Sequence, residues 1–352
     1  MASNRKKGYY VKMYMNIDQI PSELFRFKAA GKEDKEEKIK AAPTFLQDAW
    51  RRLCKNKGAV SSMALLVIII ILAFSAPVLA PYNPNKQNVP YANLPPKIPG
   101  ISINGLNGMT KLQGQWLDSY ALSNVPDNQY YIFGTDEFGR DLLSRALYGT
   151  RISLTIAFIA AVLDLTIGVI YGLTSAIKGG KTDNIMQRIL EILTGIPNLV
   201  LVVLMLLIFK PGILSIILAL TISSWIPMAR IVRGQALRLK NLEYVQSAIV
   251  LGSSQIRYAI SHILPNIAGI VVVRAMFSIP SAIFFETFLS FIGVGMKIPN
   301  ASLGTLLNSG YKMFRIHPYQ MWIPSVILCV IMLAFNLFAD GLRDAFDPKM
   351  KE

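Results

Sequence analysis

The stretch ISLTIAFIAAVLDLTIGVIYGLTSAI, residues 152–177, decides the fold class of this chain. It exceeds the roughly 20 apolar residues that cross a bilayer as a helix, and Asp164 is its one charged side chain. Only helices and closed barrels satisfy their backbone polar groups in lipid, and this run is too long for a barrel strand. The sequence therefore predicts an all-α membrane protein.

Five further apolar runs accompany this one, and together they predict six transmembrane helices. The six runs cover residues 59–80, 152–177, 192–209, 211–229, 266–288 and 322–339. The first run ends in Ala-Pro-Val-Leu-Ala, which looks like a signal-peptide cleavage site. Because residues 1–57 precede it, and a signal peptide has a much shorter basic segment, we expect it to be a retained first helix over 58–80.

The chain has a formal net charge of +15. In a membrane protein, an excess of Lys and Arg collects in the cytoplasmic loops. Lys and Arg gather before the first run, between the second and third, between the fourth and fifth, and after the sixth. In a six-span chain these segments share one side of the membrane, so both termini are expected in the cytoplasm. Because this topology accounts for the basic charge, nucleic acid is not expected as a partner. The predicted order is a cytoplasmic extension (1–57, amphipathic over 44–53), the first helix (58–80), an extracellular loop (81–150), a transmembrane core (151–342) and a cytoplasmic tail (343–352).

Several kinds of chemistry are missing from the sequence. No GxxxxGK[ST] phosphate loop occurs, so the chain does not bind ATP in that way itself. Two cysteines, Cys54 and Cys329, and two histidines are too few for a metal cluster. No internal repeat is visible, whereas a secondary transporter often carries paired repeats in one chain. We therefore expect no metal and no bound cofactor, and a symmetry mate in another subunit.

The segment between the fourth and fifth runs is typical of a docking loop at a membrane surface. Gln246, Ser247 and Ala248 are small or polar, so another protein surface can approach the backbone closely. Gly252 then permits a positive φ or a tight turn. We expect a helix on each side of this glycine, both parallel to the membrane surface; an ordinary amphipathic loop is the alternative.

The second of these helices has its own start and stop signals. Ser253 and Ser254 are good helix caps, and the helix is expected to reach Ser261. Leu264-Pro265 is expected to end it, with Pro265 in the first turn of the fifth span.

The spacing of this loop is similar to the EAA motif of the transmembrane subunits of ATP-binding-cassette importers. That motif reads Glu-Ala-Ala, three residues, Gly, nine residues and Ile-x-Leu-Pro. This chain has Gln246-Ser247-Ala248, then Gly252, then His262-Ile263-Leu264-Pro265. The spacing is intact; the first two letters and the first Ile differ, which puts in doubt any electrostatic role of the motif Glu.

Three other stretches resemble the C-type permease subunit of dipeptide and oligopeptide importers, in the same order. They are FGTDEFGRDLLSRALYGTRISL (133–154), ETFLSFIGVG (286–295) and LAFNLFADGLRDAFDP (333–348). The resemblance covers residues from about 45 to 350. It implies a type I importer permease fold with a cytoplasmic coupling-helix loop, in which the docking residues are Gln246, Ser247, Ala248, Gly252, Leu264 and Pro265.

The resemblance also implies a set of partners. They are a second, homologous permease subunit, two cytoplasmic ATPase subunits that bind ATP and Mg, and an extracellular or periplasmic peptide-binding protein. The chain itself would move peptide through the lipid bilayer without covalent chemistry. ATP binding would close the ATPase pair, move the coupling helices and switch the spans between two discrete arrangements.

Three charged residues lie inside predicted spans. An ionisable group at mid-bilayer costs about 2.5–3.5 kcal/mol on insertion scales, so such groups face protein or water. We expect Asp164 and Arg274 to pair or to line the translocation path. Independent snorkelling and pairing elsewhere are the alternative. Glu286, near the outer end of the fifth span, is expected either to face the path or to be structural.

The outer segment 134–141 contains a characteristic group of residues: Gly134, Thr135, Asp136, Gly139, Arg140 and Asp141. Asp136 is expected to cap the helical stretch Leu142 to Tyr148. Arg140 and Asp141 are expected to clamp neighbouring loops. The spacing of oxygen ligands does not suit Ca²⁺.

Three rival functions remain. A nickel-chelate or other small-solute importer has a permease subunit of the same shape. An ion-coupled transporter predicts internal repeats and several intramembrane carboxylates, which are missing. An enzyme acting within the membrane needs clustered catalytic groups, whereas Asp164 and Glu286 stand far apart in the sequence.

Overall fold

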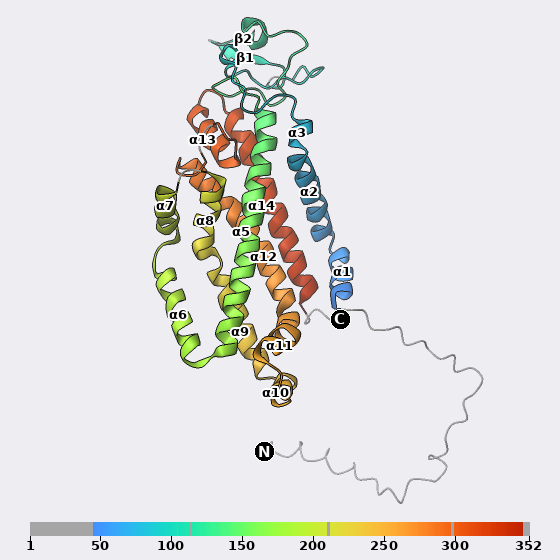
Figure 1. Cartoon of the computed structure of the whole chain (residues 1–352). Helices are drawn as coiled ribbons and strands as arrows, with labels where there is room; N and C mark the ends of the chain where they lie inside the picture. The colour runs from blue at the N-terminus through green and yellow to red at the C-terminus, as the bar shows by residue number, and fades with distance from the viewer. Residues whose placement is uncertain (1–44, 104, 113, 210–211, 297–298, 348–352) are drawn as a thin grey trace, which may run out of the picture. The chain divides into compact units, whose positions relative to one another are not determined.

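The computed structural model describes residues 45–103, 105–112, 114–209, 212–296 and 299–347. Predictions for residues 1–44 and for the last five residues of the tail lie outside the described residues. Figure 1 shows a helical bundle with an irregular cap of loops at one end, called here the loop end. The opposite end, which carries α10 (Glu243–Val250), is called the α10 end.

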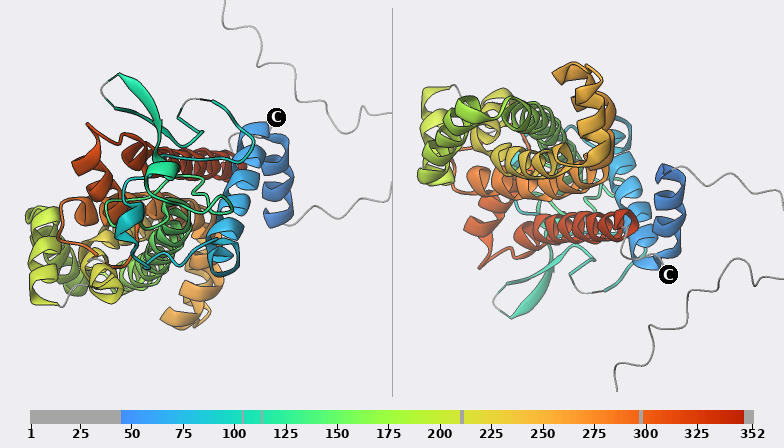
Figure 2. Two further views of the ribbon diagram at one scale, coloured as in Figure 1. Left: turned by 90° about the horizontal axis from the view of Figure 1, so that it is seen from above. Right: turned by 90° about the horizontal axis from the view of Figure 1, so that it is seen from below.

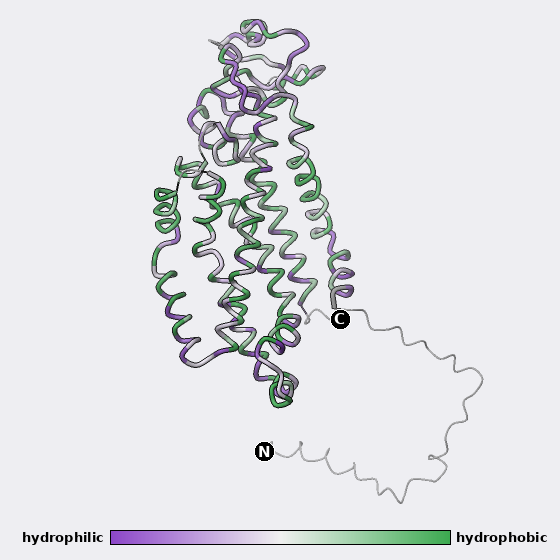
Figure 3. The backbone as a smooth tube through the Cα atoms, viewed as in Figure 1, coloured by the Kyte–Doolittle hydropathy of each residue, from purple (hydrophilic) through white to green (hydrophobic). Residues whose placement is uncertain are grey.

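Among the described residues, five helical stretches are long and apolar enough to cross a membrane. They are α2 (Lys57–Phe74), α5 (Leu142–Lys178), α8 with α9 (Ile213–Ser224 and Ile226–Lys240), α11 through α12 (Gln255–Phe291) and α14 (Tyr319–Phe346). A tube coloured by hydropathy shows the apolar residues in the body of the bundle and polar ones toward its ends (Figure 3). The prediction of an all-α membrane domain is confirmed.

The predicted third span is not one straight helix. Its residues fall on α6 (Gly180–Gly195) and α7 (Asn198–Ile208), which are bent by 84° across the break at Pro197. Proline lacks the N–H that would continue the helical ladder, and it disfavours helical geometry in the preceding residue. The bundle therefore has a sixth span only where this bent pair is taken as one.

Helix α5 forms the centre of the bundle and touches α2, α8, α9 and α12. It has 37 residues, about 55 Å at 1.5 Å per residue, so it extends beyond a hydrocarbon core of about 30 Å. The stretch Leu142 to Tyr148 and the second span are thus one helix. Small residues on α5 let neighbours approach: a Cβ on Gly172 would lie 2.5 Å from the carbonyl oxygen of Ala229 on α9.

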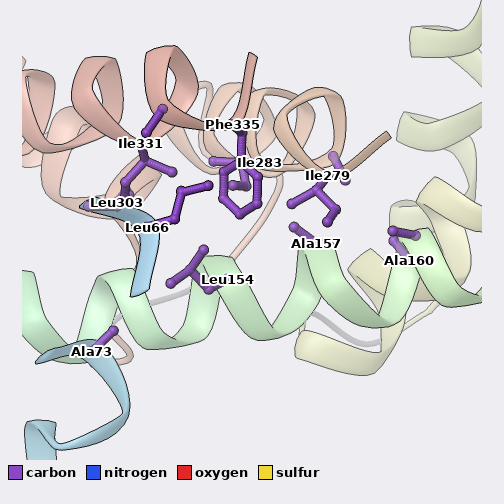
Figure 4. Packing of buried hydrophobic residues seen from close by; sticks show 13 residues of the cluster. Leu66, Ala73, Leu154, Ala157, Ala160, Ile279, Ile283, Leu303, Ile331 and Phe335 are labelled. Carbon is purple, nitrogen blue, oxygen red and sulfur yellow. The ribbon is translucent and has the colours of Figure 1, made fainter. Parts of the chain in front are cut away.

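The largest buried apolar cluster joins five helices on one side of α5. It brings Leu154 of α5 together with Leu66 of α2, Ile283 of α12, Leu303 of α13 (Leu303–Met313) and Phe335 of α14 (Figure 4). Its members are at most 8% exposed. This packing holds the sequence-distant spans together as a single core.

The loop end is built from residues 75–141 and α13. It includes α3 (Ala76–Leu79), a 3-10 turn η3 (Val89–Tyr91), an antiparallel pair β1 (Met109–Leu112) and β2 (Gln115–Asp118), and α4 (Ser119–Leu122). Met109 pairs with Asp118 and Leu112 with Gln115. The view from above shows this hairpin reaching past the helix ends (Figure 2).

Helix α1 (Phe45–Lys55) lies where the sequence predicts the amphipathic segment 44–53 and ends two residues later. Its Ala49 and Leu53 are buried, and Leu53 packs against Ala59 of α2 and Ala345 of α14. Trp50 on the same helix is 56% exposed. The buried face of α1 thus lies against its own bundle.

Candidate functional site

The α10 end carries the predicted docking loop as a sharp corner between two helices. Helix α10 ends at Val250, Gly252 has φ of +86°, and α11 (Gln255–Tyr258) begins after the cap residue Ser254. The N–H of Gly252 donates to the Ile249 carbonyl at 3.0 Å, and that of Ser253 to the Ala248 carbonyl at 3.0 Å. These bonds satisfy carbonyls at the end of α10 and require a left-handed residue at the corner.

The second helix of the corner does not end at Leu264-Pro265 as the sequence analysis expected. Helix α11 continues through a π-helical turn, η4 (Ala259–Ile263), directly into α12 (Leu264–Phe291). Pro265 stands in the first turn of α12, where its missing N–H is tolerated. The corner is therefore joined to a full-length span by continuous helix, with no loop between them.

The outer surface of the corner is apolar. Val250 is 84% exposed, Leu251 86% and Ile256 73%. The motif residues Gln246 and Ser247 are also exposed, and Ala248 is half-buried. The motif spacing pointed to the small residues and not to these apolar ones, although two aliphatic side chains directly before a turn glycine in a polar loop are a visible signal of a contact surface.

The inner surface of the corner is packed firmly into the bundle. Val245 of α10 and Ile263 of η4 are fully buried, and Tyr258 is 4% exposed. All three belong to a cluster with Val232 of α9 and Ala176 of α5. Leu264 packs against the same cluster, whereas Pro265 is exposed.

A polar network ties the helices that lead into the corner. Arg233 of α9 donates to both carboxylate oxygens of Asp183 on α6, at 2.6 and 2.5 Å. Ser175 of α5 also donates to this carboxylate. Lys240, at the end of α9, donates to the Ile177 carbonyl at 3.0 Å near the end of α5. The sequence analysis did not find this network, because no local pattern links residues so far apart.

Asp164 lies within the bundle at the level of α8. It is 3% exposed and accepts a hydrogen bond from Ser224. In the described part of the chain it forms no ion pair within 4.0 Å with Arg274. The expected direct pair is therefore absent from this arrangement of the helices.

Glu286 is fully buried between α5, α12 and α13. It accepts hydrogen bonds from Ser153 at 2.7 Å and from Ser290 at 3.0 Å. Ser153 Oγ in turn accepts from the N–H of Leu303 at 3.3 Å, in the first turn of α13. Of the two expectations, this geometry favours the structural role, since the carboxylate faces no open space.

The two glycines of the outer segment are required by close contacts. Gly134 has φ of +76° and Gly139 has φ of +69°. A Cβ on Gly134 would lie 2.4 Å from the Leu94 carbonyl oxygen, and one on Gly139 would lie 1.8 Å from that of Asn88. Thr135 adds hydrogen bonds to the same stretch, from Leu94 N–H at 2.8 Å and to the Tyr91 carbonyl at 2.5 Å. The segment thus fastens loop residues 88–94 to the start of α5.

The capping residue of α5 is Asp141, which corrects the expectation for Asp136. Asp141 Oδ2 accepts from the Ser144 N–H at 2.7 Å, directly before the first helical residue. Asp136 instead accepts from the N–H of Phe138 and Arg140 at 2.9 Å and from Arg140 Nε at 2.7 Å. The Asp136 carboxylate thus closes the turn formed by residues 136–140.

Charges in the outer segment are buried. Arg140 is fully buried, and Arg145 Nε lies 3.4 Å from the same Asp136 carboxylate. Within the described residues, the buried side-chain nitrogen and oxygen atoms that lack a hydrogen-bond partner belong to Arg140, Asp141 and Arg145. Burial raises the pKa of the Asp141 carboxyl above its usual range.

Two family models match this chain. Residues 165–352 match the family model described as "Binding-protein-dependent transport system inner membrane component", and residues 44–96 match "N-terminal TM domain of oligopeptide transport permease C". The chain belongs to the binding-protein-dependent transport system inner membrane components. The family match takes in the whole α10–α11 corner, and the second match ends at residue 96, well before the outer segment 134–141.

Two curated relatives of this inner membrane component family match nearly the whole chain. The dipeptide transport system permease protein DppC of Lactococcus lactis subsp. cremoris (strain MG1363) is 44% identical over 92% of this chain and 96% of its own length. The oligopeptide transport system permease protein OppC of Bacillus subtilis (strain 168) is 38% identical over 96% of this chain and 100% of its own length. A solved chain of the methionine ABC transporter MetNI is 18% identical, with a TM-score of 0.49, over 58% of this chain and 98% of that chain.

Proposed function

We propose that this chain is a permease subunit of an ATP-driven importer of dipeptides or oligopeptides. The observation that carries the proposal is the match to permease proteins of dipeptide and oligopeptide transport systems over nine-tenths or more of the chain. The bundle of long apolar helices supplies the membrane path. No group of three or more His, Cys, Asp or Glu side chains suited to a metal ion occurs among the described residues.

The α10–α11 corner is the proposed docking site for an ATPase subunit in the cytoplasm. Its exposed Val250, Leu251 and Ile256 form an apolar tip that a cleft on another protein would cover. Gln246, Ser247 and Ala248 leave the backbone of α10 approachable on the side of the motif. Docking at this end, with both termini in the cytoplasm, agrees with the distribution of basic residues.

The connections of the corner suggest how its motion reaches the spans. Helix α9 enters the corner from one side, and α12 leaves it through a continuous helix. A movement of the corner therefore moves two spans together, and α5, α6 and α9 are joined by Asp183 and Arg233. ATP and Mg would act in the partner ATPase pair, a second permease would complete the path, and a peptide-binding protein would dock at the loop end.

Asp164 and Arg274 remain proposed contributors to the translocation path. Arg274 is half-buried and not paired to Asp164 within 4.0 Å among the described residues, so a change of helix arrangement can bring the two together or separate them further. Glu286, in contrast, is proposed as a structural residue, because its carboxylate is enclosed by three helices.

Uptake measurements test this function directly. Cells with and without the subunit are given labelled di-, tetra- and pentapeptides and, separately, nickel. Loss of peptide uptake alone supports the proposal, and the length profile separates dipeptide from oligopeptide transport. Loss of nickel uptake with peptide uptake unchanged would keep the architecture and overturn the substrate.

A further inference from the structure

A groove of about 940 Å³ lies at the α10 end, between α1, the start of α2 and the end of α14. Its walls include Trp50, Arg51, Arg52 and Lys55 on one side and Asp344 on the other. The view from below shows α1 at the edge of the bundle beside the end of α14 (Figure 2).

The charges of the groove leave basic groups available. Asp48 is engaged by Arg52 at 2.7 Å, so these two neutralise each other. Arg51 and Lys55 are exposed and have no ion-pair partner within 4.0 Å among the described residues. Among the described residues that line the groove, Arg51 and Lys55 thus stand against Asp344 as the remaining carboxylate.

An exposed apolar surface continues from this groove along α2. Leu65, Ile68 and Leu72 are 39%, 54% and 43% exposed, and only 22% of the α2 window is buried inside the bundle. Trp50, beside the groove, is a side chain that favours the boundary between lipid and water. Cationic and aromatic side chains on α1 thus adjoin a helix, α2, that exposes aliphatic side chains.

We propose that this groove binds the headgroup of an anionic phospholipid, whose acyl chains lie along α2. The phosphate would contact Arg51 and Lys55, since basic side chains at a membrane boundary attract anionic headgroups. Trp50 would pack at the level of the glycerol. The groove has the chemistry of both parts of such a lipid, which a soluble anion does not match. This inference stands apart from the peptide cargo and from the docking of an ATPase.

Native mass spectrometry of the full-length chain, purified with the subunits that accompany it, tests the proposal. The complex is loaded in nanodiscs of phosphatidylcholine with or without phosphatidylglycerol, and retained lipids are counted. We expect retained phosphatidylglycerol and little phosphatidylcholine. Each basic residue near an anionic surface contributes about a factor of five, so Arg51→Gln with Lys55→Gln should weaken retention by about 25-fold.

The matched control removes two exposed lysines at the same end, Lys178→Gln with Lys181→Gln, and should retain phosphatidylglycerol like the unmodified protein. Equal losses in both variants, or equal retention of the two lipids, would overturn a specific site. If the double variant fails to assemble, Lys55→Gln alone should weaken retention by about fivefold.

A second measurement separates the lipid from other occupants. Phosphatidylglycerol should raise the melting temperature of the complex, and the rise should be lost in the Arg51→Gln, Lys55→Gln variant. A rise of the same size with inorganic phosphate alone would show an anion site without lipid selectivity. An unchanged melting temperature with a second subunit crosslinked to Trp50→Cys would show a protein contact instead; either result would overturn the proposal.

Discussion

Arg233 on α9 and Asp183 on α6 are joined by two hydrogen bonds, at 2.6 and 2.5 Å, beside the helices that enter the α10–α11 corner. Their side chains are 29% and 12% exposed, so solvent only partly screens the pair. The pair connects a helix that leads to the proposed docking site with the first half of the bent pair α6 and α7. It is therefore positioned to transmit motion of the corner to the side of the bundle.

Breaking this pair should reduce transport without preventing assembly. Asp183→Asn removes the charge and one strong acceptor, and a hydrogen bond to a charged group contributes about 1.5–3 kcal/mol before screening. We expect peptide uptake to fall severalfold. The matched control is Glu191→Gln on the same helix, which breaks an exposed pair with Arg188 and should change little. Equal effects of the two variants would contradict a special role for Asp183.

Gly252 should be replaceable by asparagine but not by alanine. No atom lies within 4 Å of a Cβ placed on it, so the obstacle is its φ of +86° alone. That conformation costs a side chain about 1–2 kcal/mol, and asparagine tolerates it better than most residues. We expect Gly252→Ala to uncouple ATP hydrolysis from uptake in the inserted protein, and Gly252→Asn to retain most coupling.

A glycine on α9 provides the control for that experiment. Gly234 also has open space at its Cβ position, but it has no positive φ. Gly234→Ala should leave coupling intact, because alanine suits a helix interior better than glycine. Normal uptake with Gly252→Ala would remove the main support for docking at the corner.

A substitution at Gly139 in the outer segment has two effects, a steric clash of the new Cβ and strain from the positive φ, and these can be tested separately. Gly139→Ala places a Cβ 1.8 Å from the Asn88 carbonyl oxygen and should detach loop residues 88–94. Gly114→Ala has a similar φ, +89°, but meets no atom within 4 Å. We expect rapid proteolysis of the loop end in the first variant and nearly normal resistance in the second, where backbone strain alone costs about 1–2 kcal/mol. Similar cleavage of both would show that backbone strain alone dominates.

Hydropathy predicted the spans well because length and apolarity are properties of each run by itself. The runs around residues 152–177, 266–288 and 322–339 fall inside single long helices. The sequence left open how far Pro197 bends the third span, since a proline near the start of a span is tolerated in many membrane helices. Its effect depends on whether neighbours satisfy the freed backbone groups, which no single run reveals.

Turn and cap residues in the sequence also predicted the position of the corner, whereas contacts between residues far apart in the sequence could not be predicted. Gly252 and Ser254 are turn and cap residues that act within a few positions of the chain. Asp183 and Arg233 meet only because α6 and α9 pack on α5. The capping residue of α5 could not be chosen from the sequence for a similar reason. Either Asp136 or Asp141 suits a cap, and the choice depends on where α5 begins.

Asp141 should make the stability of the loop end depend on pH. Burial raises its pKa above the ordinary value of 3.8, so the folded protein holds this proton more tightly than the unfolded chain. The resulting contribution to the free energy of unfolding is present below pH 3.8 and is lost as the pH rises through the raised pKa.

Asp141→Asn isolates this contribution, because asparagine caps a helix about as well as aspartate. Relative to this variant, the unmodified protein should lose stability as the pH rises across that window, measured by thermal unfolding. Relative to Asp141→Asn, Asp141→Ala also removes the cap and should cost about 1 kcal/mol at every pH. A constant difference between the unmodified protein and Asp141→Asn would contradict the raised pKa.

Glu286 should matter for the stability of the bundle through its hydrogen bonds. In Glu286→Leu, the buried hydroxyls of Ser153 and Ser290 lose their acceptor, and each unsatisfied buried group costs about 1–3 kcal/mol. Because Ser153 also accepts from the N–H of Leu303, the start of α13 should loosen as well. We expect a lower melting temperature and faster hydrogen exchange at Leu303.

Glu286→Gln keeps an acceptor at the same place and should retain most of this stability. It therefore distinguishes a hydrogen-bonding hub from a charge needed in the translocation path. As a hub, Glu286 predicts that uptake follows stability, with Gln close to the unmodified protein and Leu well below it. Loss of uptake in a fully stable Glu286→Gln variant would show instead that the carboxylate takes part in transport, because the stability of the bundle would then be unchanged.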